Sequence, residues 1–181
     1  MPRIHILGAS GSGTTTLGAA LANRLGVLHA DADTFFWLPT DPPFRTPRPR
    51  DDRFALLLSR LPVTGNWVFS GSATNWTKPL EPFYDLIVFL HLDTAVRLER
   101  LRRREATRYG QRIMPGGDMA AASAEFIQWA AAYDTAGAEQ RSLVAHEAWL
   151  ATQTAPVLRL NSSVSVRGLI AAVLSKIGSV Q

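Results

Sequence analysis

A glycine-rich segment near the start of the chain, Gly8-Ala9-Ser10-Gly11-Ser12-Gly13-Thr14-Thr15-Thr16, lies between a short apolar run and a helical pattern. Gly8, Gly13 and Thr15 fit the spacing G-x-x-x-x-G-x-[ST] of a phosphate-binding loop. In such a loop the glycines let successive backbone N–H groups face an anion, and the following helix adds the positive end of its dipole. We predict that the loop holds the phosphates of a nucleoside triphosphate through Gly8, Ser10, Gly11, Ser12, Gly13, Thr14, Thr15 and Thr16.

The position after the last glycine is Lys in this motif, and here it is Thr14. The lysine normally brings a positive charge to the β- and γ-phosphates, where charge shifts during phosphoryl transfer. Either another cation takes its place or turnover is low. The candidates are Lys78, which follows the third apolar run, and the arginines of the Arg97–Arg112 segment.

Polar residues follow several other apolar runs in the same way. Because ligands of open α/β sheets bind beyond the carboxyl ends of the strands, these residues are candidate site residues. The segments are Asp31-Ala32-Asp33 after the second run, Ser70-Gly71-Ser72 after the third, His91-Leu92-Asp93 after the fourth and Asn161-Ser162-Ser163 after the fifth.

The carboxylates of these segments suit either catalysis or local structure. Asp31 and Asp33 could cap a helix or form a turn, but the run Thr34-Phe35-Phe36-Trp37 that follows predicts a partly dry pocket. We therefore interpret both as site residues. Asp93 and Asp118 are interpreted instead as caps of the helices that follow them.

The positive charge of the chain is almost entirely arginine. The formal net charge is +4, and only Lys78 and Lys176 among the 19 basic residues are lysines. Guanidinium groups bind phosphates through two donors at once, so the clusters Arg45–Arg60 and Arg97–Arg112 indicate two phosphate-facing flaps, the alternative being solvated helix faces. Helical spacing would place four arginines of the second cluster on one face: Arg97, Arg100, Arg104 and Arg108.

Composition excludes several kinds of chemistry. The chain has no cysteine, and its four histidines lack metal-ligand spacing, which leaves hydroxyls, carboxylates, arginine and metal-bound phosphate. No stretch approaches the roughly 20 apolar residues of a membrane span, and the first strand begins too early to leave room for a signal peptide. We expect a soluble, cytoplasmic protein whose residues 1–181 form one domain.

Strand and helix patterns alternate along the chain, which is typical of βαβ units and a parallel sheet. The five prolines between Pro39 and Pro49 exclude a helix or a central strand there and predict an ordered flap. Phe126, Trp129 and Tyr133 recur at helical spacing and are interpreted as core. The predicted strands are Ile4–Leu7, Val27–Ala30, Trp67–Phe69, Leu86–Leu92 and Val157–Leu160, and helices are expected at Thr15–Leu25, Asp51–Leu61, after Asp93, after Asp118, at Ser142–Leu150 and at Val166–Ile177.

The loop, the Asp31-Ala32-Asp33 pair, Ser70-Gly71-Ser72 and the arginine-rich segment resemble the small P-loop kinases over nearly the whole chain. These include adenylate, shikimate and gluconate kinases and bacterial adenylate-kinase-like or topology-modulation-like proteins. The paired aspartates are more similar to the shikimate and gluconate kinases, because adenylate kinases usually have Asp where this chain has Ser70. The resemblance implies a three-layer P-loop NTPase α/β fold with five parallel strands in the order 2-3-1-4-5, helices on both faces, a substrate flap at about 35–62 and an arginine-rich lid at about 100–118.

The resemblance also implies roles for single residues, with ATP and Mg²⁺ as cofactors. Thr15 would lie near the magnesium and Thr16 near the α-phosphate. Of the two aspartates, one would hold the hydration shell of the metal and the other would meet the acceptor hydroxyl, and we expect Asp33 to position the hydroxyl or the metal-bound water. Arg104 or Arg108 would close over the transferred group, and Asn161 would border the adenine.

Three functions remain open from the sequence. The first is ATP-dependent phosphoryl transfer to a nucleoside monophosphate or a small hydroxylated metabolite. The second is a nucleotide-binding switch or pseudokinase with little turnover, which Thr14 favours. The third, nucleic-acid binding, is favoured only by net charge and is therefore not expected.

Overall fold

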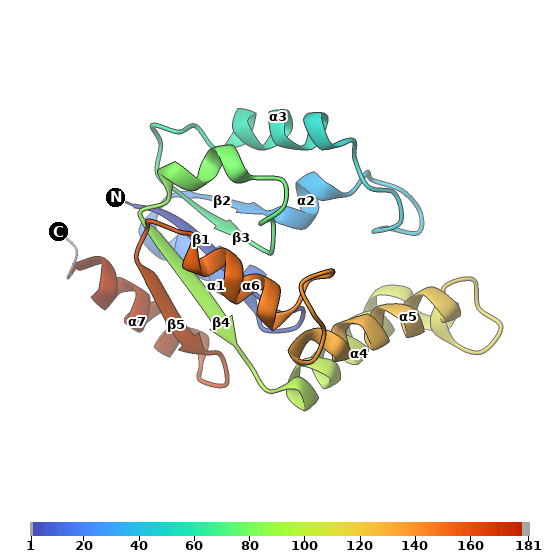
Figure 1. The fold of residues 1–181 in the computed structure, drawn as a ribbon. Helices are drawn as coiled ribbons and strands as arrows, with labels where there is room; N and C mark the ends of the chain where they lie inside the picture. The colour runs from blue at the N-terminus through green and yellow to red at the C-terminus, as the bar shows by residue number, and fades with distance from the viewer. Residues whose placement is uncertain (1, 179–181) are drawn as a thin grey trace.

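The computed structural model describes residues 2–178, and its strands and helices alternate along the chain (Figure 1). In chain order the elements are β1 (Arg3–Gly8), α1 (Thr14–Leu25), β2 (Leu28–Asp31), α2 (Ala32–Phe36), α3 (Arg50–Arg60), β3 (Trp67–Ser70), the 3-10 helix η1 (Lys78–Phe83), β4 (Leu86–His91), α4 (Thr94–Tyr109), the 3-10 helix η2 (Gly110–Ile113), α5 (Ala120–Ala131), the 3-10 helix η3 (Ala132–Asp134), α6 (Leu143–Ala151), β5 (Val157–Asn161) and α7 (Val166–Gly178).

The strands form one sheet in the order β2-β3-β1-β4-β5, and every neighbouring pair is parallel. In the register, Ile6 lies opposite Ser70 of β3 on one side and opposite Val88 of β4 on the other. A parallel sheet needs cover on both faces, because its connecting helices lie there. The α/β fold and the strand order expected from the sequence are confirmed.

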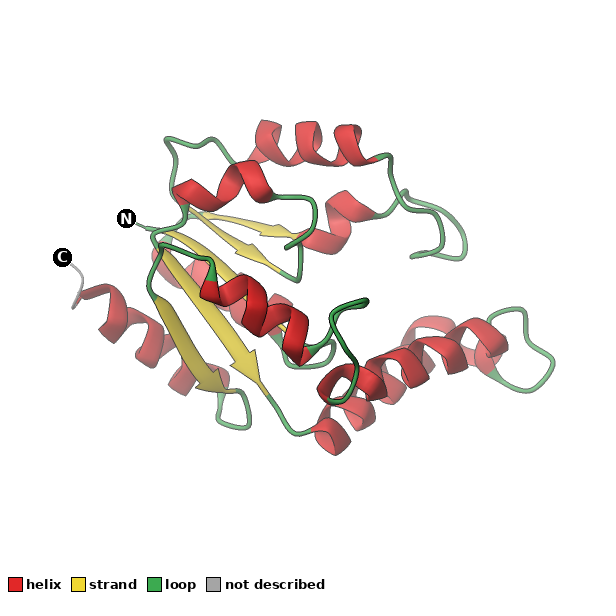
Figure 2. Cartoon of the chain, in the orientation of Figure 1, coloured by secondary structure: helices red, strands yellow, loops and turns green. Residues whose placement is uncertain are grey.

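Helices cover the two faces of the sheet and complete three layers (Figure 2). Successive strand residues point to opposite faces, so Ile6 and Leu7 belong to different cores. On the Ile6 side the sheet packs against Leu17 of α1 and Val173 of α7. On the Leu7 side it packs against residues of α3, η1 and α6: Leu57, Leu80 and Leu150.

Helices α4 and α5 extend away from the sheet beyond the carboxyl end of β4 (Figure 1). Arg97, in the first turns of α4, is fully buried. Its guanidinium donates to the carbonyl oxygens of Leu92, at 3.1 Å, and Ala130, at 3.3 Å, and pairs with Asp134 at 2.9 Å. The prediction that Arg97 shares a phosphate-facing side with the later arginines is therefore wrong, because the end of α5 packs over this turn.

Helix ends explain part of the local structure. Asp93 caps α4, as predicted, by accepting from the backbone N–H groups of Ala95 and Val96. Asp118 does not cap α5; it pairs with Arg112 at 2.6 Å, and α5 begins after Met119 without a side-chain cap. Within residues 2–178, no helix has the length and apolar character required to cross a membrane.

Candidate active site

The phosphate-binding loop joins β1 to α1 beyond the edge of the sheet. Gly11 and Gly13 have positive φ angles of 83° and 93°, which side chains rarely adopt. A Cβ atom on Gly8 would stand 2.5 Å from the carbonyl oxygen of Leu90 in β4. Glycine is therefore required at these positions for the turn and for close approach of the backbone, as the motif predicts.

The carboxylate of Asp31 connects the loop to the second and third strands. Its Oδ2 accepts hydrogen bonds from the hydroxyls of Thr15, at 2.6 Å, and Ser70, at 3.0 Å. Its Oδ1 accepts from the backbone N–H of Asp33 at 3.0 Å and so caps α2. His29 lies 2.9 Å from the Ser70 hydroxyl and supports it from behind. Asp31 thus caps a helix, which is one of the roles that the sequence offered, and it also lines the two cavities described below. Its role in catalysis stays a prediction.

Asp33 lies one residue further on but in a different environment. Asp33 is exposed where it lines the same two cavities, yet the surrounding protein desolvates its carboxylate. Desolvation, followed by the neighbouring charge of Asp31, raises the pKa of Asp33, and the charges of Arg141 and Arg104 oppose that shift. A carboxyl group in this state is a better proton acceptor than an ordinary aspartate.

Two cavities meet at this point. The first, of about 1080 Å³, follows the loop and α1 and ends at Ser162, Val164 and Leu169. The second, of about 430 Å³, lies between the flap and α4–α5 and reaches the other side of the loop. The residues that line both cavities are Gly11, Thr14, Thr15, Asp31, Asp33, Trp37, Phe44, Arg104 and Arg108.

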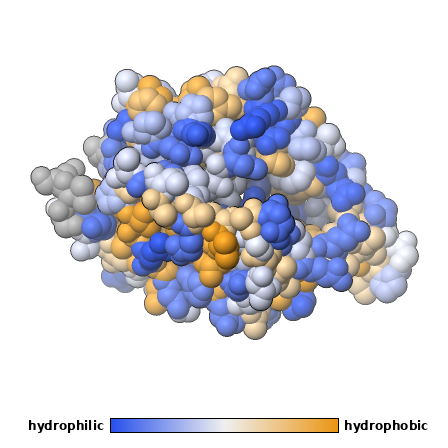
Figure 3. Space-filling view, in the orientation of Figure 1, coloured by the Kyte–Doolittle hydropathy of each residue, from blue (hydrophilic) through white to orange (hydrophobic). Residues whose placement is uncertain are grey.

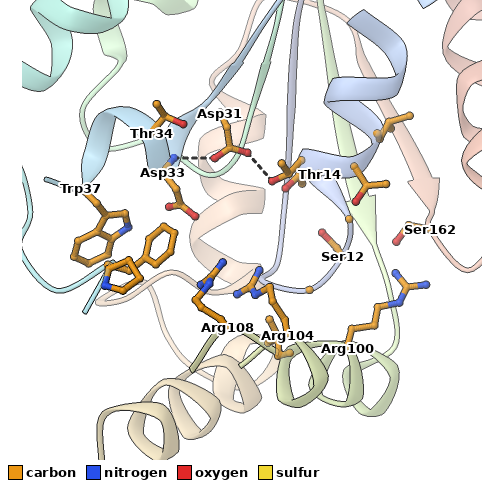
Figure 4. A pocket seen from close by; sticks show the side chains of 18 of the residues that line it. Ser12, Thr14, Asp31, Asp33, Thr34, Trp37, Arg100, Arg104, Arg108 and Ser162 are labelled. Carbon is orange, nitrogen blue, oxygen red and sulfur yellow. Dashed lines mark hydrogen bonds between the residues drawn. The ribbon is translucent and has the colours of Figure 1, made fainter. Parts of the chain in front are cut away.

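Three arginines of α4 project toward the loop (Figure 4). Arg104 and Arg108 line both cavities, whereas Arg100 lines the first, on the side of Ser12 and Ser162. The Nη1 atom of Arg100 lies 3.9 Å from the position that a Cβ on Gly13 would occupy. Burial, and then the charge of Arg108, lower the pKa of Arg104.

Two residues expected at the site lie outside both cavities. Lys78 is exposed at the start of η1 and is not among the residues that line either cavity. Asn161 is exposed as well, and its side chain accepts from the backbone N–H of Ser163 at 2.9 Å. The neighbouring Ser162 lines the first cavity instead. The adenine-bordering role of Asn161 stays a prediction.

Some residues that line the second cavity were not predicted as site residues from the sequence. Phe126 and Trp129 were expected in the core, but both are half-buried and line this cavity. They stack with ring centroids 6.1 Å apart, and the guanidinium of Arg141 lies 5.3 Å from the Trp129 centroid. Their helical spacing fits a core face equally well, so only the packing of α5 distinguishes the two positions.

A short chain of hydrogen bonds supports the wall of this cavity. The Ser72 hydroxyl lies 2.8 Å from Nε2 of His146, whose Nδ1 lies 2.7 Å from the hydroxyl of Tyr133. Desolvation, followed by the charge of Arg141, lowers the pKa of His146 to about 3, so the ring is neutral. We infer that His146 positions Ser72 and does not exchange protons with a substrate.

The oxygen donors near the loop fit a magnesium ion. Thr15 and Asp31 present hard oxygen ligands next to the phosphate-binding turn. No group of three or more His, Cys, Asp or Glu residues among residues 2–178 could hold a metal by itself. Magnesium suits this arrangement, because it keeps several waters and binds through one or two protein oxygens together with substrate phosphates.

Most hydrophilic residues on the face in Figure 3 lie over α3 and toward α4, while hydrophobic residues gather over β5 and α6.

The glycine-rich turn, the parallel sheet and the polar carboxyl edge together define a P-loop nucleotide-binding fold. Residues 4–128 match the family model described as AAA domain, and the chain belongs to this family.

A relative matches nearly the whole chain, and solved structures share its fold. The uncharacterized protein YqaC of Bacillus subtilis strain 168 is 43% identical over 176 residues, covering 97% of both chains. A shikimate kinase from Bacteroides thetaiotaomicron shares the fold with a TM-score of 0.58 at 17% identity, covering 98% of both chains. A gluconokinase from Sinorhizobium meliloti 1021 does so with a TM-score of 0.55 at 16% identity, covering 98% of this chain and 92% of that one. The resemblance to small P-loop kinases of the shikimate and gluconate kinase type is thus confirmed for the fold.

Proposed function

We propose that this protein transfers the γ-phosphoryl group of ATP to the hydroxyl group of a small acceptor molecule. The observation that carries the proposal is that the loop, Asp33 and Arg104 line both cavities. A nucleotide in the first cavity and an acceptor in the second would therefore meet at these residues. Such an arrangement supplies proximity, the main source of catalysis in phosphoryl transfer.

The nucleotide would occupy the first cavity with its phosphates on the backbone N–H groups of the loop. Thr15 and Asp31 would hold Mg²⁺, which, when bound, neutralises charge on the phosphate oxygens. Asp31 takes the metal side in this proposal because it shares the Thr15 hydroxyl, and Asp33 is left for the acceptor. The base would lie toward Ser162, Val164 and Leu169.

The transfer itself forms one bond and breaks one. The acceptor oxygen bonds to the γ-phosphorus as the bond from that phosphorus to the β–γ bridging oxygen breaks, and ADP leaves with the electron pair. The hydroxyl proton passes to Asp33, whose raised pKa suits a base. Arg104 would stabilise the charge on the transferred group.

Arg100 would replace the missing lysine of the loop. Its guanidinium approaches Gly13, next to Thr14, and no ion pair to it is formed by the acidic groups within residues 2–178. Lys78, the other candidate, lies outside both cavities. The charge then comes from α4 and not from the loop, so phosphate binding depends on where α4 lies.

A coupled assay of ADP release tests the function. With ATP and magnesium, we expect release to depend on an added small hydroxylated acceptor, and mass spectrometry should find that acceptor phosphorylated. Thermal stabilisation by ATP without turnover on any acceptor would favour the second candidate, a nucleotide-binding switch, which Thr14 supports. Absence of any stabilisation by millimolar ATP would refute both, because linkage predicts about 2.7 kcal/mol at a hundredfold excess over Kd.

A further inference from the structure

A row of polar side chains lies between the sheet and the first turns of α1. His29 and Asp31 of β2 point to the same face of the sheet, because strand side chains alternate. Ser70 of β3 is the register partner of Asp31, and Val68, two residues before it, belongs to the core that α1 covers. His29, Ser70 and Asp31 therefore share the face on which α1 packs, and Ser70 is fully buried there.

The hydrogen bonds along this row have a defined direction. The Ser70 hydroxyl has one hydrogen and donates it to Oδ2 of Asp31 at 3.0 Å. Nε2 of His29 lies 2.9 Å from the same hydroxyl oxygen, so the imidazole is the donor in that bond. The Thr15 hydroxyl donates to Oδ2 of Asp31 from the side of the loop, at 2.6 Å. A chain of donors thus runs from His29 through Ser70 to the carboxylate beside the phosphate-binding loop.

Helix α1 leaves room for this chain at Gly18, one turn after Thr15. A Cβ atom on Gly18 would stand 2.6 Å from Nε2 of His29 and 2.8 Å from Cβ of Ser70, closer than real Cβ contacts. Glycine inside a helix is less favourable than alanine, so helix formation does not explain this residue. The close approach of His29 and Ser70 to the helix does explain it.

We propose that His29 is a positioning residue, which acts through Ser70 to hold the Asp31 carboxylate in place on the magnesium side of the loop. This inference rests on the proposed function, in which Thr15 and Asp31 hold Mg²⁺. His29 lines neither of the two cavities, so its effect on the ion passes through Ser70. Without the imidazole donor, the Ser70 hydroxyl can rotate to another acceptor, and Asp31 then loses one of the two hydroxyls that orient it.

Calorimetry with ATP tests this role through the ratio of two dissociation constants, one measured in EDTA and one in excess magnesium chloride. In the wild type we expect magnesium to strengthen ATP binding. His29→Leu should reduce this magnesium-dependent gain by about tenfold, as losses of outer partners of metal ligands do, and should leave the Kd in EDTA unchanged. His29→Gln returns an N–H donor to the place of Nε2 and should restore the gain.

Gly18→Ala tests the same contact from the side of the helix. Its Cβ must displace the imidazole, so this variant should reproduce the loss seen in His29→Leu although every hydrogen-bonding residue is still present. Gly168→Ala, in α7, is the matched control, because a Cβ there would have its nearest contact at 3.5 Å. It should behave like the wild type.

A double variant tests the route through Ser70. Once Ser70→Ala has removed the hydroxyl, adding His29→Leu should cause no further loss of the magnesium-dependent gain, because the two residues act in series. A further loss of about tenfold in the double variant would show that His29 acts by another route, and it would overturn the proposal.

Three other results would also overturn it: an unchanged gain in His29→Leu, equal weakening of ATP binding with and without magnesium, which indicates a structural role, or no gain in the wild type. Transfer of labelled phosphate from ATP separates this inference from the proposed function. If His29→Leu loses the gain but the wild type phosphorylates no acceptor, the role of His29 stands and the kinase function fails. If the wild type phosphorylates an acceptor and His29→Leu keeps the full gain, the kinase function stands and this inference is wrong.

Discussion

At the scale of single residues, Asp31 and Asp33 differ in what they touch. Asp31 is bound by two hydroxyls and caps α2, so its orientation is fixed from several directions. Asp33 faces the two cavities, where the desolvating surroundings raise its pKa. Asp31 is therefore suited to present its carboxylate charge at a fixed position, and Asp33 is suited to accept a proton.

Asp33→Asn should lower the turnover number by on the order of a hundredfold with little change in ATP affinity, because it removes a base while keeping the shape. Since the pKa of Asp33 is raised, the wild-type kcat/KM should fall as the pH drops through a value above that of an ordinary aspartate, and the variant should lack this limb. Steady-state kinetics over a pH series measures both effects. Asp52→Asn, on the exposed side of α3, is the control, and a few-fold loss in Asp33→Asn would instead indicate a structural carboxylate.

Arg100 gives a second test at this scale. Arg100→Ala should weaken ATP binding tenfold to a hundredfold, because a charged partner of the phosphates is lost. Adding Thr14→Lys to that variant should restore most of the affinity by returning the charge to the loop. Titration with ATP and magnesium compares both variants with Arg102→Ala. An unchanged Kd in Arg100→Ala would exclude Arg100 as the replacement for lysine.

At the scale of elements, α4 has two different ends. Its first turns are anchored through Arg97 to α5 and η3, whereas its last residue reaches the flap, where the Tyr109 hydroxyl donates to the Pro43 carbonyl oxygen at 3.1 Å. In η2, which follows directly, Arg112 pairs with Asp41 at 2.6 Å. The segments expected as lid and flap therefore contact each other in this structure. Because its first turns are anchored, the orientation of α4 is fixed. Arg100, Arg104 and Arg108 therefore approach the loop from a fixed direction.

Arg97→Met should destabilise the protein by about 3 kcal/mol, because it removes the guanidinium that donates to two buried carbonyl oxygens and that pairs with Asp134. Urea unfolding measures the loss. Arg103→Met, at a side chain that is 79% exposed and pairs with Glu99, should change stability by less than about 0.5 kcal/mol. Similar losses in the two variants would contradict the anchoring role.

At the scale of the whole molecule, a side chain buried inside the sheet contacts the backbone at the carboxyl edge of the sheet. His5 is fully buried in β1, packs against Phe69 and Tyr84, and its Nε2 lies 3.0 Å from the carbonyl oxygen of Gly71, which lines the second cavity. Desolvation lowers the pKa of His5 to about 4 against the weaker, opposite effect of that hydrogen bond. The folded protein therefore requires the neutral ring.

This requirement predicts loss of stability in mild acid. The stability associated with neutral His5 is fully present above the unfolded pKa of 6.5 and is lost as the pH falls toward about 4. The free energy of unfolding should drop by roughly 1.4 kcal/mol per pH unit from this residue in that window. His5→Gln keeps an N–H donor and cannot titrate. Between pH 6 and 5, the change of its free energy of unfolding with pH should therefore be smaller than that of the wild type by close to one proton, or about 1.4 kcal/mol per pH unit. An unchanged slope would place the titration elsewhere, for example at His146.

The sequence by itself determined the features that depend on local chemistry. Glycine spacing predicted the phosphate-binding loop, because its positive φ angles and close backbone contacts exclude other residues. Apolar runs and helical periodicity predicted the five strands and most helices, since burial imposes those patterns on neighbouring residues. The cap at Asp93 was predictable because its carboxylate directly precedes the helix and can accept from the first free N–H groups.

Only the tertiary structure decided which of several equivalent side chains reach the cavities. Arg97 and Arg104 stand seven residues apart in one helix, yet Arg97 is buried against Ala130 at the end of α5, whereas Arg104 lies near Phe126 and lines both cavities. In the same way, Phe126 and Trp129 line a cavity and Arg141 lies beside them through contacts that cross long stretches of chain. Residue spacing predicts which side chains share a face of a helix, but not what packs against that face. For this reason the sequence could not predict which of these side chains are buried and which line the cavities.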